Sequence, residues 1–61
     1  MTTESEARVA LVATYRKFRR KMGATRMDRT IERTPDFSVR SQRSAPGWIY
    51  YPRTDVVERV Q

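Results

Sequence analysis

The spacing of apolar residues in the first third of the chain most constrains its fold. These residues recur every three or four positions, which places them on one face of an α-helix. Thr3 and Glu6 match a capping box at the start of this pattern, and Gly23 is a natural stop after it. The sequence therefore predicts an amphipathic helix over residues 4–22. Its apolar face consists of Ala7, Leu11, Tyr15, Phe18 and Met22.

The last two turns of this predicted helix hold most of the chain's excess charge. Residues 16–22 carry +5 of the formal net charge of +6, whereas residues 1–15 carry −1. The cations in this run are Arg16, Lys17, Arg19, Arg20 and Lys21. Like charges at this density repel one another. An anionic partner would relieve that repulsion.

The middle of the chain predicts a second, shorter helix over residues 26–33. Thr25 is its expected cap, and Met27 and Ile31 share one face. Pro35 disfavours a helical conformation at the residue before it, so we expect the helix to end there.

The rest of the chain predicts a β-hairpin over residues 37–51 and then a helical turn over residues 55–60. Strand 37–43 pairs with 48–51, and the turn falls at 44–47, where proline and glycine are found. Together these elements predict an α+β fold, with residues 1–61 as a single small domain.

Two pairs of large side chains alternate along the second predicted strand. Trp48 and Tyr50 point to one face, and Ile49 and Tyr51 to the other. We expect Trp48 and Tyr50 to face the core and the other pair to be exposed.

The segment from Gly47 to Val56 resembles the wing and following helix of small excisionase-type winged-helix proteins, whose wing ends in a similar Pro-Arg-x-Asp-aliphatic pattern. The resemblance covers about ten residues and implies a helix after Asp55. Upstream the chain departs from that family, because Pro35 falls where the recognition helix would run. We therefore infer no membership.

The composition argues against catalysis and against the usual metal sites. The chain has no Cys and no His, so it lacks the commonest general base, the strongest nucleophile and the usual zinc ligands. Asp28 and Glu32 share a helical face, but we expect them to pair with Arg29 and Arg33 as exposed carboxylates do. The sequence therefore predicts no enzyme activity, no cofactor and no metal.

A chain of 61 residues buries a small core, which here no disulfide can reinforce. We therefore expect a partner to stabilise the fold: nucleic acid, another protein or a second copy. The sequence shows neither a signal peptide nor a stretch of about 20 apolar residues. The expected location is the cytoplasm or the interior of a virion.

Three interpretations of the basic run remain: nucleic-acid binding, a solvated helix face, and a membrane-surface or peptide-target helix. Nucleic-acid binding without catalysis is favoured. The alternative is a small structural or regulatory subunit that docks on an acidic surface of a larger assembly, such as a phage particle or an enzyme complex. The predicted phosphate contacts are Arg16, Lys17, Arg19, Arg20 and Lys21, with Arg40, Arg43 and Arg53 on the hairpin as a second site.

Overall fold

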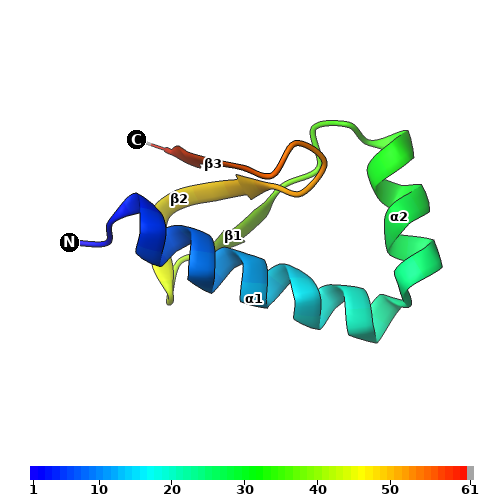
Figure 1. Cartoon of the computed structure of the whole chain (residues 1–61), viewed down its shortest axis with the longest axis horizontal. Coiled ribbons are helices and arrows are strands. Elements are labelled where there is room, and N and C mark those ends of the chain that lie inside the picture. Colours follow the sequence, from blue (N-terminus) through cyan, green and yellow to red (C-terminus); the bar gives the residue numbers. More distant parts are fainter. Residues whose placement is uncertain (61) are drawn as a thin grey trace.

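The computed structural model describes residues 1–60, which form two helices and a three-stranded antiparallel sheet (Figure 1). The predicted α+β class is confirmed. Helix α1 runs Glu4–Met22, as predicted. In its capping box the Glu6 N–H donates to Thr3 Oγ1 at 3.2 Å, and the Thr3 N–H donates to Glu6 Oε1 at 3.0 Å. These hydrogen bonds to Thr3, through its backbone first and its side chain second, lower the pKa of Glu6.

Helix α2 (Ala24–Arg33) follows α1 after a single residue. The predicted cap of this helix is wrong, because Thr25 lies inside the first turn. The N-cap is Gly23, so no side chain caps the helix. Gly23 has a φ of 98°, which glycine adopts at little cost, so the chain changes direction in one residue and α2 starts at once. The helix ends at Arg33, and its C-cap Thr34 lies immediately before Pro35, as expected.

The sheet is a meander of three short strands in the order β1-β2-β3. They are β1 (Val39–Ser41), β2 (Ala45–Tyr51) and β3 (Val56–Arg59). The predicted hairpin corresponds to β1 and β2, in which Val39 lies opposite Tyr50. β2 is the central strand and pairs with both neighbours.

The turn between β1 and β2 spans residues 42–44 and lies earlier than the predicted 44–47. The Ser44 N–H donates to Ser41 Oγ at 3.0 Å and closes this turn. β2 therefore begins at Ala45, which is 1% exposed within the core, and the following proline and glycine lie in the strand. Burial of the alanine outweighs the turn propensity of its neighbours.

The predicted helical turn at residues 55–60 is wrong, because Val56–Arg59 forms strand β3. Asp55 adopts a φ of 57°, a left-handed conformation that reverses the chain and interrupts any helix there. Val57 then lies opposite Tyr50 and is buried, while Val56 is exposed, which is the alternation of a strand. The helix implied by the winged-helix resemblance is therefore not formed.

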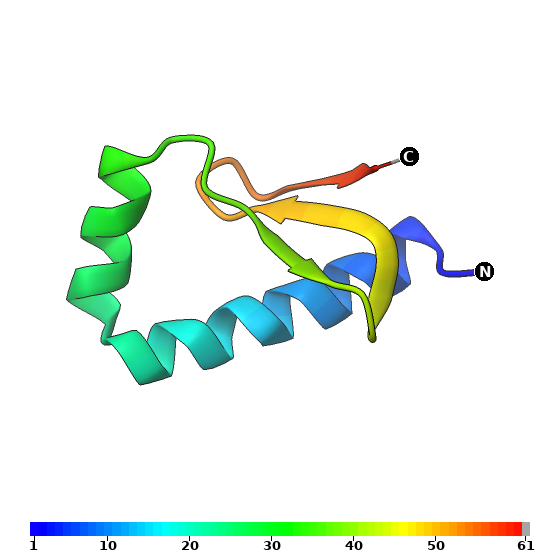
Figure 2. The same cartoon turned by 180° about the vertical axis from the view of Figure 1, so that it is seen from behind.

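Helix α1 lies across one face of the sheet, and α2 turns away from it at the far end (Figures 1 and 2). The rings of Tyr15 and Tyr50 meet edge to face across the interface, with centroids 6.1 Å apart. The core between α1 and the sheet consists of Ala7, Leu11, Val39, Ala45, Tyr50 and Val57.

The other face of the sheet carries Ile49, which was expected to be exposed. Tyr50 is buried and Trp48 is half-buried, but Ile49 is also only 4% exposed, so that part of the prediction is wrong. Ile49 lies on the central strand between Arg40 and Glu58. The aliphatic stems of these cross-strand neighbours are placed to shield it on both sides.

Candidate nucleic-acid interface at the end of the long helix

Helix α1 is longer than the sheet that it covers. Its 19 residues span about 28 Å, whereas the seven residues of the longest strand span about 23 Å. The consequence is visible along the predicted apolar face: Ala7 and Leu11 are 0% exposed, but Phe18 is 49% and Met22 is 39% exposed. The last turns of α1 therefore project past the sheet and have α2 beside them (Figure 1).

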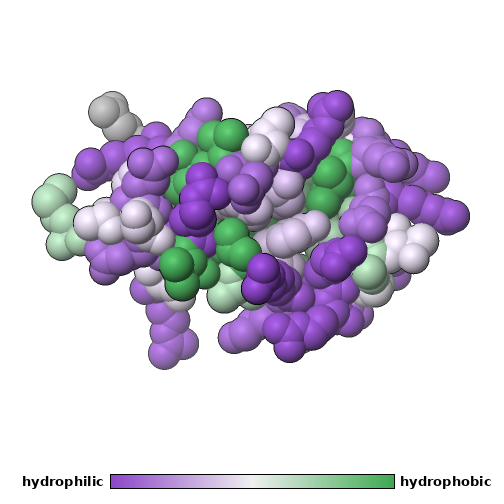
Figure 3. Space-filling model, in the orientation of Figure 1, coloured by the Kyte–Doolittle hydropathy of each residue, from purple (hydrophilic) through white to green (hydrophobic). Residues whose placement is uncertain are grey.

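The five cationic side chains predicted as phosphate contacts lie on this projecting part. We call residues 16–22 the basic end of α1, and every residue in it is exposed. Within residues 1–60, one of its cations has an ion-pair partner: Arg19 lies 3.5 Å from Asp28 of α2. The predicted pairing of Asp28 with Arg29 or Arg33 is replaced by this contact between helices. In Figure 3 hydrophilic side chains dominate the surface over the end of α1, whereas apolar patches lie over its first half and the sheet.

Three arginines of the basic end surround one hollow at the corner between the helices. Arg16, Arg19 and Arg20 line it together with Ala24, around a volume of about 260 Å³. The first turn of α2 at this corner contains no acidic residue and has no side-chain cap.

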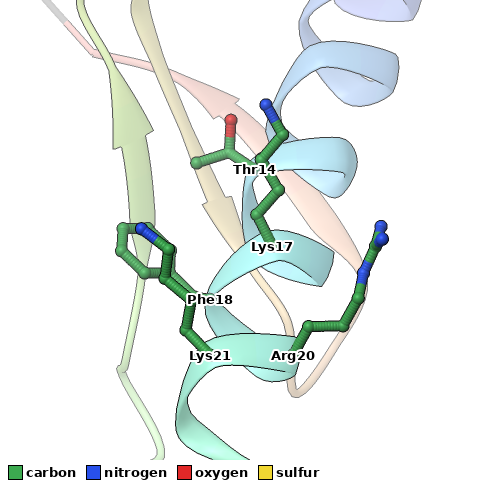
Figure 4. A pocket seen from close by; sticks show the side chains of 5 residues that line it. All are labelled: Thr14, Lys17, Phe18, Arg20 and Lys21. Carbon is green, nitrogen blue, oxygen red and sulfur yellow. The ribbon is translucent and has the colours of Figure 1, made fainter.

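A second hollow of about 380 Å³ lies along the basic end and exposes an aromatic ring. Figure 4 shows Phe18 and Lys21 extending from the same side of α1, with Thr14 and Lys17 one turn earlier and Arg20 directed away. The sequence placed Phe18 on the core face of the helix. It is half-exposed because the sheet ends before reaching it.

The three hairpin arginines do not form one site with the basic end. Arg43 lies in the turn before β2 and Arg53 in the turn after it, so the length of the strand separates them. The turn before β2 lies beside the first half of α1 in both views, away from the basic end (Figures 1 and 2). Arg40 and Trp48 do line a common hollow of about 270 Å³.

The hairpin aromatics are largely occupied by contacts within the fold. The indole N–H of Trp48 donates to the Thr2 carbonyl at 3.3 Å, and its ring packs against the core. The Tyr50 hydroxyl donates to Asp55 Oδ1 at 2.8 Å. The hairpin therefore has little free aromatic area from these two residues.

Sequence reasoning missed a polar contact that ties the last turn to the long helix. Arg8 Nη1 donates to the Asp55 carbonyl at 3.0 Å and lies 3.2 Å from Asp55 Oδ1. The same carboxylate accepts the Tyr50 hydroxyl. Burial first, and then this hydrogen bond and charge, raise the pKa of Tyr50 to about 12. We call Arg8, Tyr50 and Asp55 the latch.

Within residues 1–60, carboxylates do not gather in threes where they could hold a metal ion. Neither of the two helices described has both the length and the apolar character needed to cross a membrane.

The basic end of α1 is thus the strongest candidate surface. It combines clustered exposed cations, a corner lined by three arginines and a half-exposed aromatic ring. No protein-family model, curated protein or solved structure matches this chain.

Proposed function

We propose that this chain is a non-catalytic nucleic-acid-binding protein that holds the phosphate backbone with the basic end of α1. The observation that carries the proposal is the exposure of all five cations there, with one ion pair among them within residues 1–60. Clustered arginine and lysine side chains release condensed counterions when they neutralise phosphates. Arginine also suits phosphate geometry, because its planar fork can donate two hydrogen bonds at once.

The cations of the basic end repel one another where no anion lies between them. Arg16 and Arg20 lie four residues apart on the helix, as do Lys17 and Lys21, and like charges at that spacing repel. A bound phosphate backbone would turn this repulsion into attraction. Arg40, Arg43 and Arg53 can add peripheral phosphate contacts, but their separation makes them secondary.

The experiment is a salt titration with duplex DNA, single-stranded DNA and structured RNA. The test variant carries Arg16→Gln, Arg19→Gln and Arg20→Gln, which removes three charges while keeping good helix formers. On duplex DNA the slope of log K against log salt should become shallower by about 2 to 3 units, since each phosphate contact contributes about 0.9. Affinity should weaken similarly on unrelated sequences, because phosphate contacts carry no sequence information.

The matched control carries Arg40→Gln, Arg43→Gln and Arg53→Gln, which removes the same charge elsewhere. Its slope should change by less than that of the test variant. Equal losses in the two variants would mean that net charge, and not the basic end, governs binding. A parent protein that binds no nucleic acid even at low salt would overturn the proposal.

The second candidate function is a subunit that docks on an acidic protein surface of a larger assembly. Val9 favours it: this side chain is 73% exposed and lines a hollow with Val12, Ala13 and Arg16. An apolar stripe beside arginines is a common composition for a protein interface. This candidate takes precedence if the titration detects no nucleic-acid binding, and Val9→Asp should then abolish docking.

A further inference from the structure

We propose that Phe18 is a stacking platform for an unpaired base, so that the strand held by the basic end of α1 is single-stranded at this point. The inference rests on the proposed function and names its ligand class. It concerns the hollow that Phe18 lines with Thr14, Lys17, Arg20 and Lys21.

The ring is available because of where the sheet ends. Phe18 continues the face that buries Ala7 and Leu11, yet 49% of it is exposed, since α1 projects past the strands. It is not among the residues that form or border the core cluster. Because half of this large aromatic side chain is still in contact with water, covering it with a base would contribute binding free energy.

The charges around the ring define what could lie on it. Lys21 is three residues after Phe18, so their Cβ atoms are about 5 to 6 Å apart on one side of the helix. Figure 4 shows both side chains extending in the same direction. Lys17 and Arg20 also line the hollow, although the Arg20 side chain extends away from Phe18 (Figure 4). A ligand that fits is flat and apolar at its centre and anionic at its edges, as an unpaired nucleotide within a strand is.

The geometry favours a single strand over a duplex. In a duplex each base is covered above and below by its neighbours, so an aromatic ring cannot reach a base face without unstacking it. Proteins that bind single strands combine a cationic groove with exposed aromatic rings, and each stacked base contributes independently of its identity. The ring of Trp48 is a weaker candidate, because it packs on the core and its N–H is bonded to Thr2.

The test compares a 12-nucleotide oligo-dT with an abasic strand of the same length and charge. Phosphate contacts are available on both strands, but stacking requires the bases. We expect the parent to bind oligo-dT about 5- to 150-fold more tightly than the abasic strand, the range that one stacked base contributes. Phe18→Ala should remove most of this difference and leave abasic binding unchanged. Phe18→Trp should retain the preference, and the fluorescence of the introduced indole should change when oligo-dT binds.

Val9→Ala is the matched control, since it removes an exposed apolar side chain from the opposite face of α1. It should keep the preference for oligo-dT, and circular dichroism should show that all three variants fold. If the parent binds the two strands equally, or if Phe18→Ala keeps the preference, the stacking inference fails while the phosphate proposal stands. If neither strand binds at low salt, the stacking inference fails, and the phosphate proposal fails with it only if duplex DNA and structured RNA do not bind either.

Discussion

The two halves of helix α1 have the same apolar periodicity and different environments. In the first half the apolar face of the helix is buried: Leu11 is 0% exposed beneath the sheet. In the second half the same face is in contact with solvent, and Phe18 is 49% exposed. The difference lies outside the helix, in the length of the strands that cover it. Apolar periodicity thus predicts the helix, whereas the partner element decides which part of its face becomes core.

The comparison also separates stability from function. The covered half supplies the packing that holds α1 to the sheet, and the latch reinforces it through Asp55. The projecting half contributes little to the core and carries the charge cluster. Substitutions should therefore act on folding in the first half and on binding in the second.

The largest expected effect is the stability difference between Leu11→Ala and Phe18→Ala. Leu11 is fully buried, so its truncation leaves a cavity and should cost about 2 to 5 kcal/mol. For so small a domain that is a large share of the total stability. Phe18→Ala should cost roughly 1 kcal/mol or less, because its side chain is half-exposed already. Urea unfolding followed by far-UV circular dichroism measures both. Equal costs would show that the end of α1 is packed in solution.

Local signals in the sequence predicted the helical part of the fold well. The capping box at Thr3 and the stop at Gly23 are short-range features, and the bounds of α1 follow from them. Thr34 ends α2 because Pro35 follows it, which is also a local effect. These features need no knowledge of the rest of the molecule.

Long-range contacts decided what could not be predicted. Residues 56–59 form a strand because Val57 pairs with Tyr50 and joins the core, and no short window shows that pairing. The latch joins Arg8 to Asp55 across 47 positions of sequence. The charge cluster of the candidate site is contiguous in sequence and could be read directly. The exposure of Phe18 could not, because it depends on where the sheet ends.

An intermediate effect is expected from the latch when the pH is raised. The pKa of Tyr50 is raised from 10.0 to about 12 in the folded protein, so folding favours the protonated hydroxyl. The stabilisation is therefore fully present below about pH 10 and is lost as the pH rises to about 12. Absorbance at 295 nm should show one tyrosine ionising near pH 12, and Tyr50→Phe should remove that step. Tyr51→Phe is the control and should keep it.

The free energy of unfolding, measured over the same pH range, tests whether the latch stabilises the covered half of α1. The parent should lose stability between pH 10 and about 12, and Tyr50→Phe should lose less over that range. If the two proteins lose stability in parallel, the burial of the Tyr50 hydroxyl and its hydrogen bond to Asp55 do not contribute to folding in solution.

The smallest expected effect on stability concerns the ion pair at the projecting end. Arg19 and Asp28 lie 3.5 Å apart with side chains 44% and 57% exposed, so solvent screens their attraction. Asp28→Asn should therefore change the free energy of unfolding by less than about 1 kcal/mol. It should also release Arg19 for phosphate binding. Nucleic-acid affinity should rise, and the salt slope should steepen by up to about 0.9 units.

Glu32→Gln provides the matched control for this prediction, because it removes the same charge from α2 without touching the ion pair of Arg19 and Asp28. A general electrostatic effect would raise affinity equally in both variants, whereas release of Arg19 would raise it more in Asp28→Asn. Salt titrations on one duplex, with unfolding measured in parallel, separate the two. If Asp28→Asn weakens binding, the Asp28 carboxylate orients Arg19 toward phosphate. The nucleic-acid-binding region would then consist of α2 together with the projecting half of α1.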